Sequence, residues 1–457
     1  MRADRLEWEK RLLADDGPLR KIAREVKGPF HVMFPEQIIE NIRGFQNAFA
    51  GSGVDGLIYY GKKANKSACV TAACAKAGAG VDVASAGELE SALRTGIRGT
   101  DVMVTGPAKS DELLLLATDV NATIAIDGPG ELDRLGYLVH HRGSGAPARI
   151  VLRVLPADST SRFGMTGAEL DSVWDRLDPA AVRLRGFSFH LGGYGVAPRA
   201  ELAASLIDRC LDARAHGHDA DLLSIGGGFS VNYLAAEQWE AFLDGANPSW
   251  FHGGHAFSRD SYYPYHSPSP GPAMLTAILE YDGLGDRLRA ENIRLAIEPG
   301  RALLDRAGST VFRVQGIKTR EAEGIPYDIL TVDGTSLSLS EQWFNTEYLP
   351  DPVIWPERNG STTPTCVGGA SCLESDMLSW RRIPLPRAAV VDDLLVYPNT
   401  AGYQMDSNES EFHELPVPPK VVLSYSAGGP QFDCVREPDP RDARRGITSP
   451  TRAPRSS

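Results

Sequence analysis

Short aliphatic stretches alternate with longer amphipathic segments between about residues 54 and 300. The short stretches are rich in β-branched residues, and the segments between them, such as Ala86–Thr95 and Ala200–His216, have the apolar spacing of helices. This alternation predicts repeated strand–helix units in an α/β fold. The predicted strands are Val54–Tyr60, Gly80–Val83, Asp101–Val104, Ala122–Ile126, Ile150–Val154, Leu184–His190, Leu222–Ile225 and Arg294–Ile297. Eight strands of this kind favour a closed, TIM-like (β/α)8 barrel over an open doubly wound sheet.

The pattern changes after Arg301, where strand-like runs are broken by Pro, Gly and Asn. These runs are Thr310–Gln315, Ile329–Val332, Ala388–Val391, Leu394–Tyr397 and Lys420–Leu423. They predict a mostly β C-terminal domain. We therefore divide the chain into an N-terminal segment (1–29), a barrel (30–305), a β domain (306–436) and a polar, disordered tail (437–457). The helical pattern before Phe30 could pack on either domain.

Residues 230–272 form a long insertion after the seventh predicted strand, and it is rich in aromatic residues. These are Trp239, Trp250, Phe251, Tyr262, Tyr263 and Tyr265. Long loops at the C-terminal face of a barrel often form lids or pocket walls. A surface excursion packed on its own aromatic side chains is an equally good interpretation.

Composition narrows the class of protein. A chain of 457 residues with a net charge of −12 has room for two domains and is a poor match for the phosphate backbone of nucleic acids. The N-terminus is charged throughout and no apolar run is long enough to span a membrane, so we expect a cytoplasmic protein. Six cysteines without CxxC spacing predict reduced thiols and no metal site.

Reactive side chains follow the predicted barrel strands, which is where the site of a (β/α)8 barrel lies. In chain order they are Lys63, Asp82 and Ser85, Lys109, Arg153, His190, Gly226–Gly228 and Glu298–Arg301. The glycine triplet offers bare backbone N–H groups that can cradle a phosphate. A lysine opposite a phosphate site is what an aldehyde cofactor needs. By themselves, however, Lys62, Lys63 and Lys66 are more often simply surface lysines.

Seven motifs in order resemble the fold-type III pyridoxal-phosphate decarboxylases, the family of ornithine, arginine and diaminopimelate decarboxylases. The motifs are YYGKKANKS, GVDVASAGEL, FSFHLGG, SIGGGF, AIEPGRALL, GASCLESDML and NTAGYQM. The resemblance spans roughly residues 30–415, and the ordered set is much more specific than any single motif. It implies an alanine-racemase-like barrel followed by a β domain, pyridoxal 5′-phosphate as the cofactor, and decarboxylation of a small-molecule amino-acid substrate.

The resemblance also implies roles for residues of the barrel. Lys63 matches the lysine that forms the Schiff base, and Asp82 matches an acidic neighbour of that lysine. His190 matches the histidine that stacks on the cofactor ring, although a lone histidine at a strand end is more often structural. Arg153 matches a pocket arginine beside the cofactor. Glu298 matches the glutamate that keeps the pyridine nitrogen protonated, so that the ring accepts the electron pair left at Cα when carbon dioxide departs.

Phosphate and proton-transfer roles are implied for a further set of positions. Residues that fall where the family grips the phosphate are Gly227, Gly228, Gly300, Arg301 and Tyr403. Cys372 resembles the cysteine that reaches across a dimer interface and supplies the proton to Cα, with Glu374 or Asp376 near enough to adjust its acidity. This implies a homodimer with shared active sites. Without the family, Cys372 would be interpreted as a small buried hydrophobe.

The chain departs from the family pattern at three places. Gly193 stands where the family commonly has a serine that can bind phosphate, and Leu373 separates Cys372 from Glu374, which weakens a diaminopimelate assignment. The segment VDGTSLSLSEQWF lacks an arginine common in enzymes specific for diaminopimelate and offers Asp333, Glu341 and Trp343 instead. Asp333 could attract a distal ammonium group or could simply be a turn residue before Gly334.

We therefore predict a decarboxylase that acts on a diamino acid or on a bulkier siderophore or antibiotic intermediate with an α-amino acid head. The alternative is an amino-acid racemase or epimerase on the same cofactor, although such a racemase usually presents an arginine to the ring nitrogen. A non-catalytic relative is a third interpretation. Retention of Lys63, Glu298 and Cys372 together counts against it.

Overall fold

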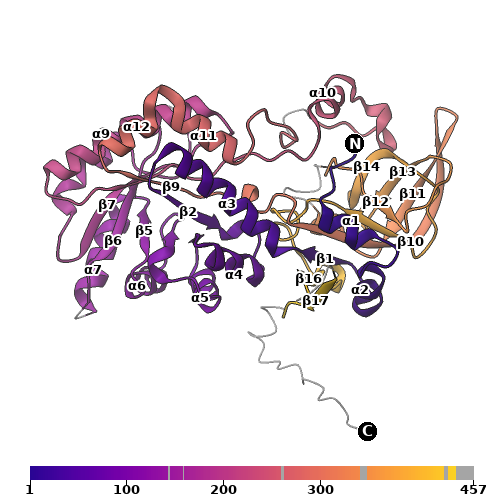
Figure 1. Cartoon of the computed structure of the whole chain (residues 1–457), viewed down its shortest axis with the longest axis horizontal. Coiled ribbons are helices and arrows are strands. Elements are labelled where there is room, and N and C mark those ends of the chain that lie inside the picture. Colours follow the sequence, from indigo (N-terminus) through magenta and orange to yellow (C-terminus); the bar gives the residue numbers. More distant parts are fainter. Residues whose placement is uncertain (143–144, 158, 259–261, 340–346, 427–430, 439–457) are drawn as a thin grey trace, which may run out of the picture.

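The computed structural model describes residues 1–142, 145–157, 159–258, 262–339, 347–426 and 431–438. Parallel strands between residues 56 and 297 close into a barrel (Figure 1). In barrel order they are β2 (Gly56–Gly61), β3 (Gly80–Val83), β4 (Val102–Val104), β5 (Thr123–Ile126), β6 (Ala148–Arg153), β7 (Val182–Ser188), β8 (Leu222–Ser224) and β9 (Arg294–Ile297). Each overlaps a strand predicted from the sequence, so the predicted barrel is confirmed.

Helices pack on the outside of the barrel and alternate with its strands (Figure 1). They are α3 (Pro35–Ser52), α4 (Ala68–Ala77), α5 (Ala86–Arg94), α6 (Asp111–Asp119), α7 (Pro129–His141), α8 (Gly167–Ser172), α9 (Val196–Ala215), α11 (Pro272–Glu280) and α12 (Leu284–Ala290). Local signals start several of them. The Ser85 hydroxyl accepts a hydrogen bond from Glu88 N at 3.2 Å and caps α5, so this strand-end residue has a structural role.

The barrel interior is filled rather than open. Its inward-facing side chains form a buried cluster of their own, made of Tyr59, Met103, Ala125, Val151, Leu222 and Ala296. These residues come from β2, β4, β5, β6, β8 and β9. A plugged barrel has no central channel, so a ligand site must lie at one of its rims.

The second domain is a mostly β sheet, as the sequence predicts. Its main path runs β14-β13-β11-β10-β1-β16-β17, and β15 pairs with β10 and β12. The strands are β1 (Phe30–Met33), β10 (Gly308–Ala322), β11 (Ile325–Val332), β12 (Val353–Trp355), β13 (Thr363–Gly368), β14 (Met377–Leu385), β15 (Leu394–Tyr397), β16 (Lys420–Tyr425) and β17 (Phe432–Arg436). Together with the barrel, this sheet gives an elongated two-domain molecule (Figure 1).

Two predicted assignments in this region are wrong. Phe30–Met33, placed at the start of the barrel, pairs antiparallel with β10 and parallel with β16, so it belongs to the sheet. Ala388–Val391, predicted as a strand, is an irregular turn before β15 in which Val390 and Val391 are exposed. An apolar run can be mistaken for a strand when it is solvent-facing instead of buried.

The N-terminal segment packs on the sheet domain, which settles the choice that the sequence left open. Helices α1 (Glu7–Leu13) and α2 (Leu19–Val26) bury apolar side chains against the sheet. The shared cluster includes Trp8, Leu12, Leu19 and Ile22 from the helices and Phe30, Val32, Val311 and Leu394 from the sheet. The Trp8 indole also donates a hydrogen bond to the Arg306 carbonyl at 3.2 Å.

The C-terminal boundary also differs from the prediction at one residue. Glu437, expected to begin the tail, accepts hydrogen bonds from Ser67 Oγ at 2.8 Å and Cys69 N at 2.7 Å, at the start of α4. The last sheet strand is therefore tied to the barrel through this carboxylate. The predicted tail beyond residue 438 lies outside the described residues.

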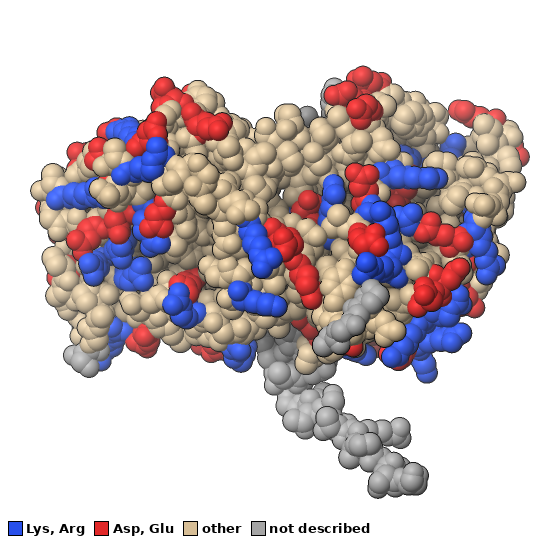
Figure 2. Space-filling model, in the orientation of Figure 1, with Lys and Arg blue, Asp and Glu red and all other residues tan. Residues whose placement is uncertain are grey.

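Within the described ranges, no helix is both long and apolar enough to cross a membrane. Among the same residues, no cluster of His, Cys, Asp and Glu has the arrangement of a metal site. Positive and negative side chains are interspersed over the face drawn in Figure 2. Many charged side chains of the described residues form ion pairs, for example Arg183 with Asp219 and Arg287 with Asp208.

Candidate active site

The reactive residues predicted at the strand ends meet at one rim of the barrel. Lys63 lies in the short helical turn Lys62–Ala64 directly after β2. Asp82 lies within β3, and Arg153 is the last residue of β6. Because parallel strands present their C-terminal ends to the same rim, these side chains share one environment, and their charges act on one another.

Lys63 stands among acidic groups. Burial lowers the pKa of Lys63, but the charges of Asp82, Tyr403 and Glu298 outweigh burial, so the pKa is raised above its ordinary value. Arg153 opposes this effect. The neighbouring Lys62 is buried, and its Nζ donates to the Lys66 carbonyl at 3.3 Å, so it has a structural partner instead. The lysine that faces the acidic groups is thus Lys63, as the motif implied.

Two carboxyl groups share this pocket and are buried together. Burial and the charge of Glu298 raise the pKa of Asp82 to about 8, against the lowering effect of Lys63. Thr105 Oγ1 donates a hydrogen bond to Asp82 at 2.7 Å. Burial likewise raises the pKa of Glu298, while Ser224 Oγ donates to its Oε1 at 2.6 Å. A pair of buried carboxyls beside one lysine can hold a proton near neutral pH and share it with a bound base.

Sequence reasoning missed the serines on the inner side of the barrel. Ser188 ends β7, where it is paired in register with Arg153 on one side and Ser224 on the other. Its Oγ is buried and has no hydrogen-bond partner among the described residues. A buried hydroxyl without a partner beside a lysine and two carboxyls is consistent with a polar ligand at this rim. Ser188 and Ser224 each end a short apolar strand. Their position at the end of an apolar run was the sequence signal that could have identified them as rim residues.

His190 and the glycine triplet lie against each other. His190 follows β7, and its Nδ1 accepts a hydrogen bond from Gly227 N at 3.3 Å. The imidazole is accessible from the rim, yet desolvation by the surrounding protein, with the charges of Lys63 and Arg153, lowers its pKa to about 4. His190 is therefore a neutral, flat ring at physiological pH. Such a ring can stack on another aromatic ring without adding charge.

The triplet must be glycine for steric reasons. A Cβ on Gly226 would lie 2.6 Å from the Phe189 carbonyl oxygen, and the residue has φ +66°. A Cβ on Gly227 would lie 2.8 Å from the Glu298 carbonyl oxygen. Gly228 has φ +83°. The loop thus brings backbone close to its neighbours at a strand end, which is the arrangement of an anion-binding nest.

Arg199, in α9, holds this loop in place and was not predicted. It is fully buried, and its guanidinium donates to the carbonyls of Gly195 at 2.9 Å, Leu191 at 3.1 Å and Gly193 at 2.6 Å. Gly193 stands where the family commonly has serine, and its φ is +69°, a conformation that favours glycine. The chain therefore lacks the serine hydroxyl at position 193, and the Arg199 guanidinium holds the loop through its carbonyl groups. A helical arginine gives no sequence signal for this role.

Arg153 is oriented by a local partner. Its Nη1 lies 3.2 Å from Asp127 Oδ1, and its guanidinium lies 4.6 Å from the ring centroid of Phe163. Its charge acts on Lys63, His190 and Glu298. Lys109, the other strand-end cation, forms a buried ion pair with Glu131 at 3.0 Å and therefore has a structural role.

The C-terminal domain contributes Tyr403 to the rim. Tyr403 N donates to the Ala64 carbonyl at 2.7 Å, next to Lys63, and the residue has φ +72°. A Cβ on Gly300 would lie 2.8 Å from the Tyr403 hydroxyl. Gly300, Tyr403 and the turn that carries Lys63 are therefore packed against one another.

Aromatic residues of the insertion contact Arg301 at the C-terminal rim of the barrel. Arg301 Nη1 donates to the Tyr233 hydroxyl at 2.8 Å, and its guanidinium lies 4.1 Å from the ring centroid of Tyr263 and 4.9 Å from that of Tyr403. Farther along the insertion, the ring of His255 stacks on Trp380 of β14 at 4.3 Å. The described parts of the insertion, 230–258 and 262–272, thus form a wall between the barrel rim and the sheet domain, which favours the first of the two predicted interpretations.

The three predicted substrate contacts have different environments. Asp376 is buried, and its carboxylate accepts hydrogen bonds from Ser336 N at 2.7 Å and Ser371 N at 3.1 Å. Its contacts are those of a loop anchor, because its oxygens are satisfied by backbone. Asp333 Oδ1 accepts from Arg313 N at 2.8 Å, which supports the turn interpretation. Glu374 is exposed. Glu341 and Trp343 lie outside the described residues.

Cys372 is exposed, contrary to the general expectation for a free cysteine. It lies in the loop between β13 and β14, and its Sγ is 3.1 Å from His413 Nε2. Nothing in the sequence signalled His413. The two residues are 41 positions apart and meet only through the fold.

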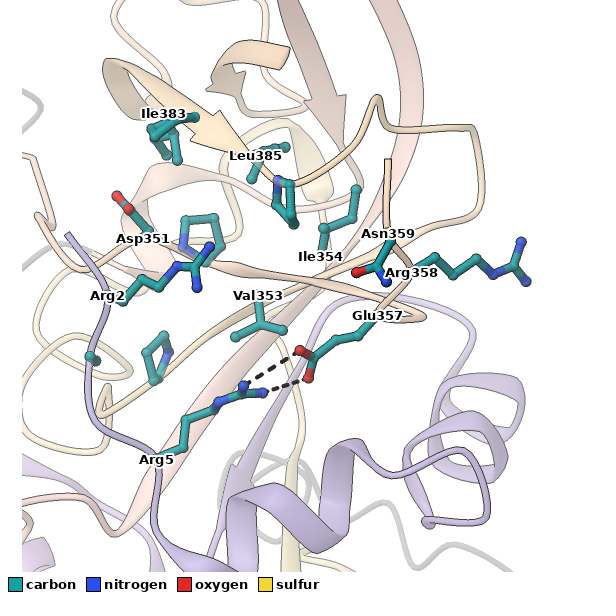
Figure 3. A pocket seen from close by; sticks show the side chains of 15 residues that line it. Arg2, Arg5, Asp351, Val353, Ile354, Glu357, Arg358, Asn359, Ile383 and Leu385 are labelled. Atoms are coloured by element: carbon teal, nitrogen blue, oxygen red, sulfur yellow. Dashed lines mark hydrogen bonds and ion pairs between the residues drawn. The ribbon is translucent and has the colours of Figure 1, made fainter. Parts of the chain in front are cut away.

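A separate cleft lies between the N-terminal residues and the sheet domain (Figure 3). It measures about 430 Å³ and is lined by charged and apolar side chains. Arg5 Nη1 binds Glu357 Oε1 at 2.5 Å, as the dashed lines in Figure 3 mark, and Asp351 pairs with Arg381 at 2.6 Å. Arg5, Glu357 and Asp351 therefore have partners within the protein, and none of the strand-end residues lines the cleft.

Residues 35–248 match the family model described as pyridoxal-dependent decarboxylase, pyridoxal binding domain. The chain is 35% identical over 431 residues to the uncharacterized protein y4yA of Sinorhizobium fredii, covering 92% of this chain and 93% of that protein. It is 23% identical to the diaminopimelate decarboxylase of Zymomonas mobilis over 90% of this chain and 91% of that enzyme. The crystal structure of the M. jannaschii diaminopimelate decarboxylase in co-complex with L-lysine superposes with a TM-score of 0.75 at 19% identity, covering 95% of this chain and 96% of that one.

Proposed function

Because the chain belongs to the fold-type III pyridoxal-phosphate-dependent amino-acid decarboxylases, we propose that it removes the α-carboxylate of its substrate at the rim formed by Lys63, Asp82 and Glu298. The observation that carries the proposal is the position of Lys63 among buried carboxyl groups whose pKa values are raised. A strand-end lysine in this setting, opposite a glycine cradle, has the features needed for cofactor chemistry.

The residues at the rim fit pyridoxal 5′-phosphate. Lys63 would hold it covalently through Nζ, and Glu298 would face its ring nitrogen with a carboxyl that burial keeps protonated more readily than usual. The neutral imidazole of His190 would stack on its ring. The backbone near Gly227, Gly228, Gly300 and Arg301, with the Tyr403 hydroxyl, would grip its phosphate. When bound, the cofactor supplies the electron sink for the electron pair left at Cα.

The remaining steps fall to side chains of the protein. The charges of Asp82 and Glu298 raise the pKa of Lys63, and the charge of Arg153, at the end of β6, lowers it. The insertion residues Tyr233 and Tyr263 wall off the rim beside Arg301, which restricts water near the reacting carboxylate. Loss of carbon dioxide leaves Cα in need of a proton, and we assign that donation to the thiol of Cys372.

We further propose that the substrate is a diamino acid or a bulkier siderophore or antibiotic intermediate. Three departures from a diaminopimelate site support this: Leu373 displaces Glu374, Glu374 is exposed, and Asp376 is satisfied by backbone. The aromatic side chains of the described insertion residues, such as Tyr233 and Tyr263, supply large flat surfaces instead of a fixed polar contact. Such surfaces suit a substrate with an extended or acylated distal end.

The proposal includes a homodimer with shared sites. Cys372 is exposed at the end of a loop of the sheet domain, with Leu373 exposed beside it. An exposed cysteine beside an exposed leucine fits a tip that a second copy of the chain covers. In that arrangement each barrel receives Cys372 from its partner. A racemase is disfavoured because Glu298, rather than an arginine, is available to the ring nitrogen.

The test is carbon dioxide release by the cofactor-loaded protein with a panel of diamino acids, diaminopimelate isomers and N-acylated or citryl diamino acids. We expect release from one class, reduced more than about a thousandfold in Lys63→Ala. Lys66→Ala is the matched control, because the Lys66 amine is half-exposed and binds the Asp406 carbonyl at 3.3 Å and Glu409 at 3.4 Å instead of the carboxyl groups beside Lys63. Inversion at Cα without release of carbon dioxide would instead identify a racemase.

A further inference from the structure

The Cys372 thiol has a partner that the proposed reaction has not yet used. Sγ lies 3.1 Å from His413 Nε2, and the Cys372 backbone N lies 3.4 Å from the same nitrogen. The two side chains come from separate loops, one between β13 and β14 and the other in the turn η10 (Phe412–Glu414) before β16. Both are exposed, so solvent alone would satisfy them if they were apart.

The loop that carries Cys372 is firmly anchored. The Asp376 carboxylate accepts from the backbone of Ser336 and Ser371, and the Gly369 N donates to the Asp376 carbonyl at 2.7 Å. Ala370 N donates to the Gly334 carbonyl at 2.8 Å. These bonds fix both ends of a short loop to the sheet, so the position of the thiol is set by the fold and not by a mobile tip.

The turn that carries His413 adopts a conformation that costs free energy. His413 has φ +59° and Glu414 has φ +58°, and neither is glycine. Left-handed backbone at such residues costs on the order of 1 kcal/mol each. The ring of Phe412 lies 4.2 Å from that of His413. This turn directs the imidazole at the sulfur, and its unusual conformation marks it as a candidate functional feature.

The geometry points to His413 as a positioning residue for Cys372, an inference that rests on the proposed function. We propose that the imidazole holds Sγ in place and returns a proton to it in each turnover. When the S–H bond breaks and its proton forms the new C–H bond at Cα, the sulfur is left as a thiolate. His413 Nε2 accepts from the Cys372 N–H and so begins without a proton; water protonates Nε2, leaving hydroxide, and that proton then passes to Sγ and re-forms the S–H bond.

Exposed apolar side chains lie beside both Cys372 and His413. Leu373 is 37% exposed and Phe412 is 39% exposed, so each loop presents a large hydrophobic side chain beside its polar residue. Acidic residues of the same two loops are Glu374, Asp376, Glu411 and Glu414. A second copy of the chain covering this tip would shield the thiol and imidazole from solvent and strengthen their interaction.

The test measures thiolate formation against pH by ultraviolet absorbance in the cofactor-loaded protein, as the difference between each protein and its Cys372→Ser counterpart. The other thiols do not interfere, because burial raises the pKa of Cys69, Cys74, Cys210, Cys366 and Cys434. An imidazole within hydrogen-bond distance favours the thiolate. We expect the midpoint to rise by about one pH unit in His413→Asn, because asparagine tolerates left-handed backbone but does not titrate.

His140→Gln, which changes an exposed histidine paired with Asp178 on the barrel, is the control and should leave the midpoint unchanged. Equal midpoints in the parent protein and His413→Asn would overturn the proposal. With an active substrate, His413→Asn should also lower kcat about tenfold with little change in KM, since proton return follows binding. If the midpoint of thiolate formation shifts in His413→Asn but no substrate releases carbon dioxide, the interaction of Cys372 with His413 is supported and the proposed decarboxylase function is rejected. Failure of the inference can therefore be told apart from failure of the proposed function.

Discussion

The two rims of the barrel are both rich in charge, but they use it differently. At the N-terminal rim, a hollow of about 600 Å³ is lined by arginines, and Arg294 and Arg98 bind Asp55 and Asp101 at 2.7 and 2.6 Å. At the C-terminal rim, Lys63 faces two carboxyl groups whose pKa values are raised. The two pairs named at the first rim are largely exposed, whereas the second rim holds two desolvated carboxyl groups beside Lys63.

This comparison shows why a hollow with charged walls is not by itself an active site. Exposed pairs such as Arg294 with Asp55 contribute at most about 1 kcal/mol. Buried carboxyl groups without a full set of opposite charges reduce the stability of the fold. Their raised pKa values allow them to bind and release protons near neutral pH. We expect substitutions at the two rims to differ accordingly.

The largest difference should come from Glu298→Gln. The amide keeps the volume and can still accept the Ser224 hydrogen bond, but it carries no titratable proton for the ring nitrogen. We expect kcat/KM for carbon dioxide release to fall about a hundredfold to a thousandfold. Asp55→Asn makes the same acid-to-amide change at the other rim and should stay within about twofold of the parent protein. A loss below tenfold in Glu298→Gln would remove the distinction between the rims.

The parts of this site that the sequence could predict are those fixed by local pattern. Lys63, Glu298 and His190 were placed at strand ends because the apolar runs locate the strands, and their roles came from the resemblance of their motifs to the decarboxylase family. Arg199 and His413 were missed because their partners are backbone and side-chain groups that only the tertiary fold brings near. Local pattern carries no information about which distant segment will lie opposite.

The same reason explains the errors in the fold. Phe30–Met33 precedes the barrel along the chain and was assigned to it, yet its hydrogen-bond partners are Gly308–Val311 and Lys420–Val422. Strand pairing over such separations cannot be read from periodicity. The anchoring contacts of Asp376 could not be predicted either, because the backbone groups that donate to its carboxylate come from two other loop positions.

A smaller effect is expected from the glycine packing of the C-terminal rim. In Gly300→Ala the new Cβ would lie 2.8 Å from the Tyr403 hydroxyl and 3.1 Å from the Ala64 Cβ, so the tyrosine must shift. We expect affinity for pyridoxal phosphate, measured by equilibrium dialysis, to fall about tenfold, which is about 1.4 kcal/mol. Gly136→Ala in α7 is the control, because its Cβ would meet nothing within 4 Å.

The double variant Gly300→Ala with Tyr403→Phe separates crowding from other causes. Removing the hydroxyl removes the closest contact, so the added methyl should cost less in the Tyr403→Phe background than in the parent background. An equal cost in both backgrounds would show that Ala64 or the backbone, and not Tyr403, limits the space.

The smallest effect concerns the charge on Lys63 and can be measured without any substrate. In cofactor-free protein, Asp82→Asn removes the first carboxylate that raises the pKa of Lys63, and burial then lowers that pKa. More of the amine is unprotonated at a given alkaline pH, so acetylation of Lys63, followed by mass spectrometry, should be about threefold faster at pH 9. Asp55→Asn should leave the rate unchanged.

The pH dependence of this difference follows from the sign of the shift at Asp82. Its pKa is raised to about 8, so in the parent protein Asp82 is mostly neutral below that pH and resembles asparagine. The two labelling rates should therefore converge as pH falls towards 7 and separate as it rises through 8 to 10. A difference that persists at pH 7 would show that Asp82 stays ionised and is paired as tightly as the aspartates of the opposite rim. Equal rates at every pH would mean that Glu298 alone governs the lysine, and the C-terminal rim would then carry one active carboxylate instead of two.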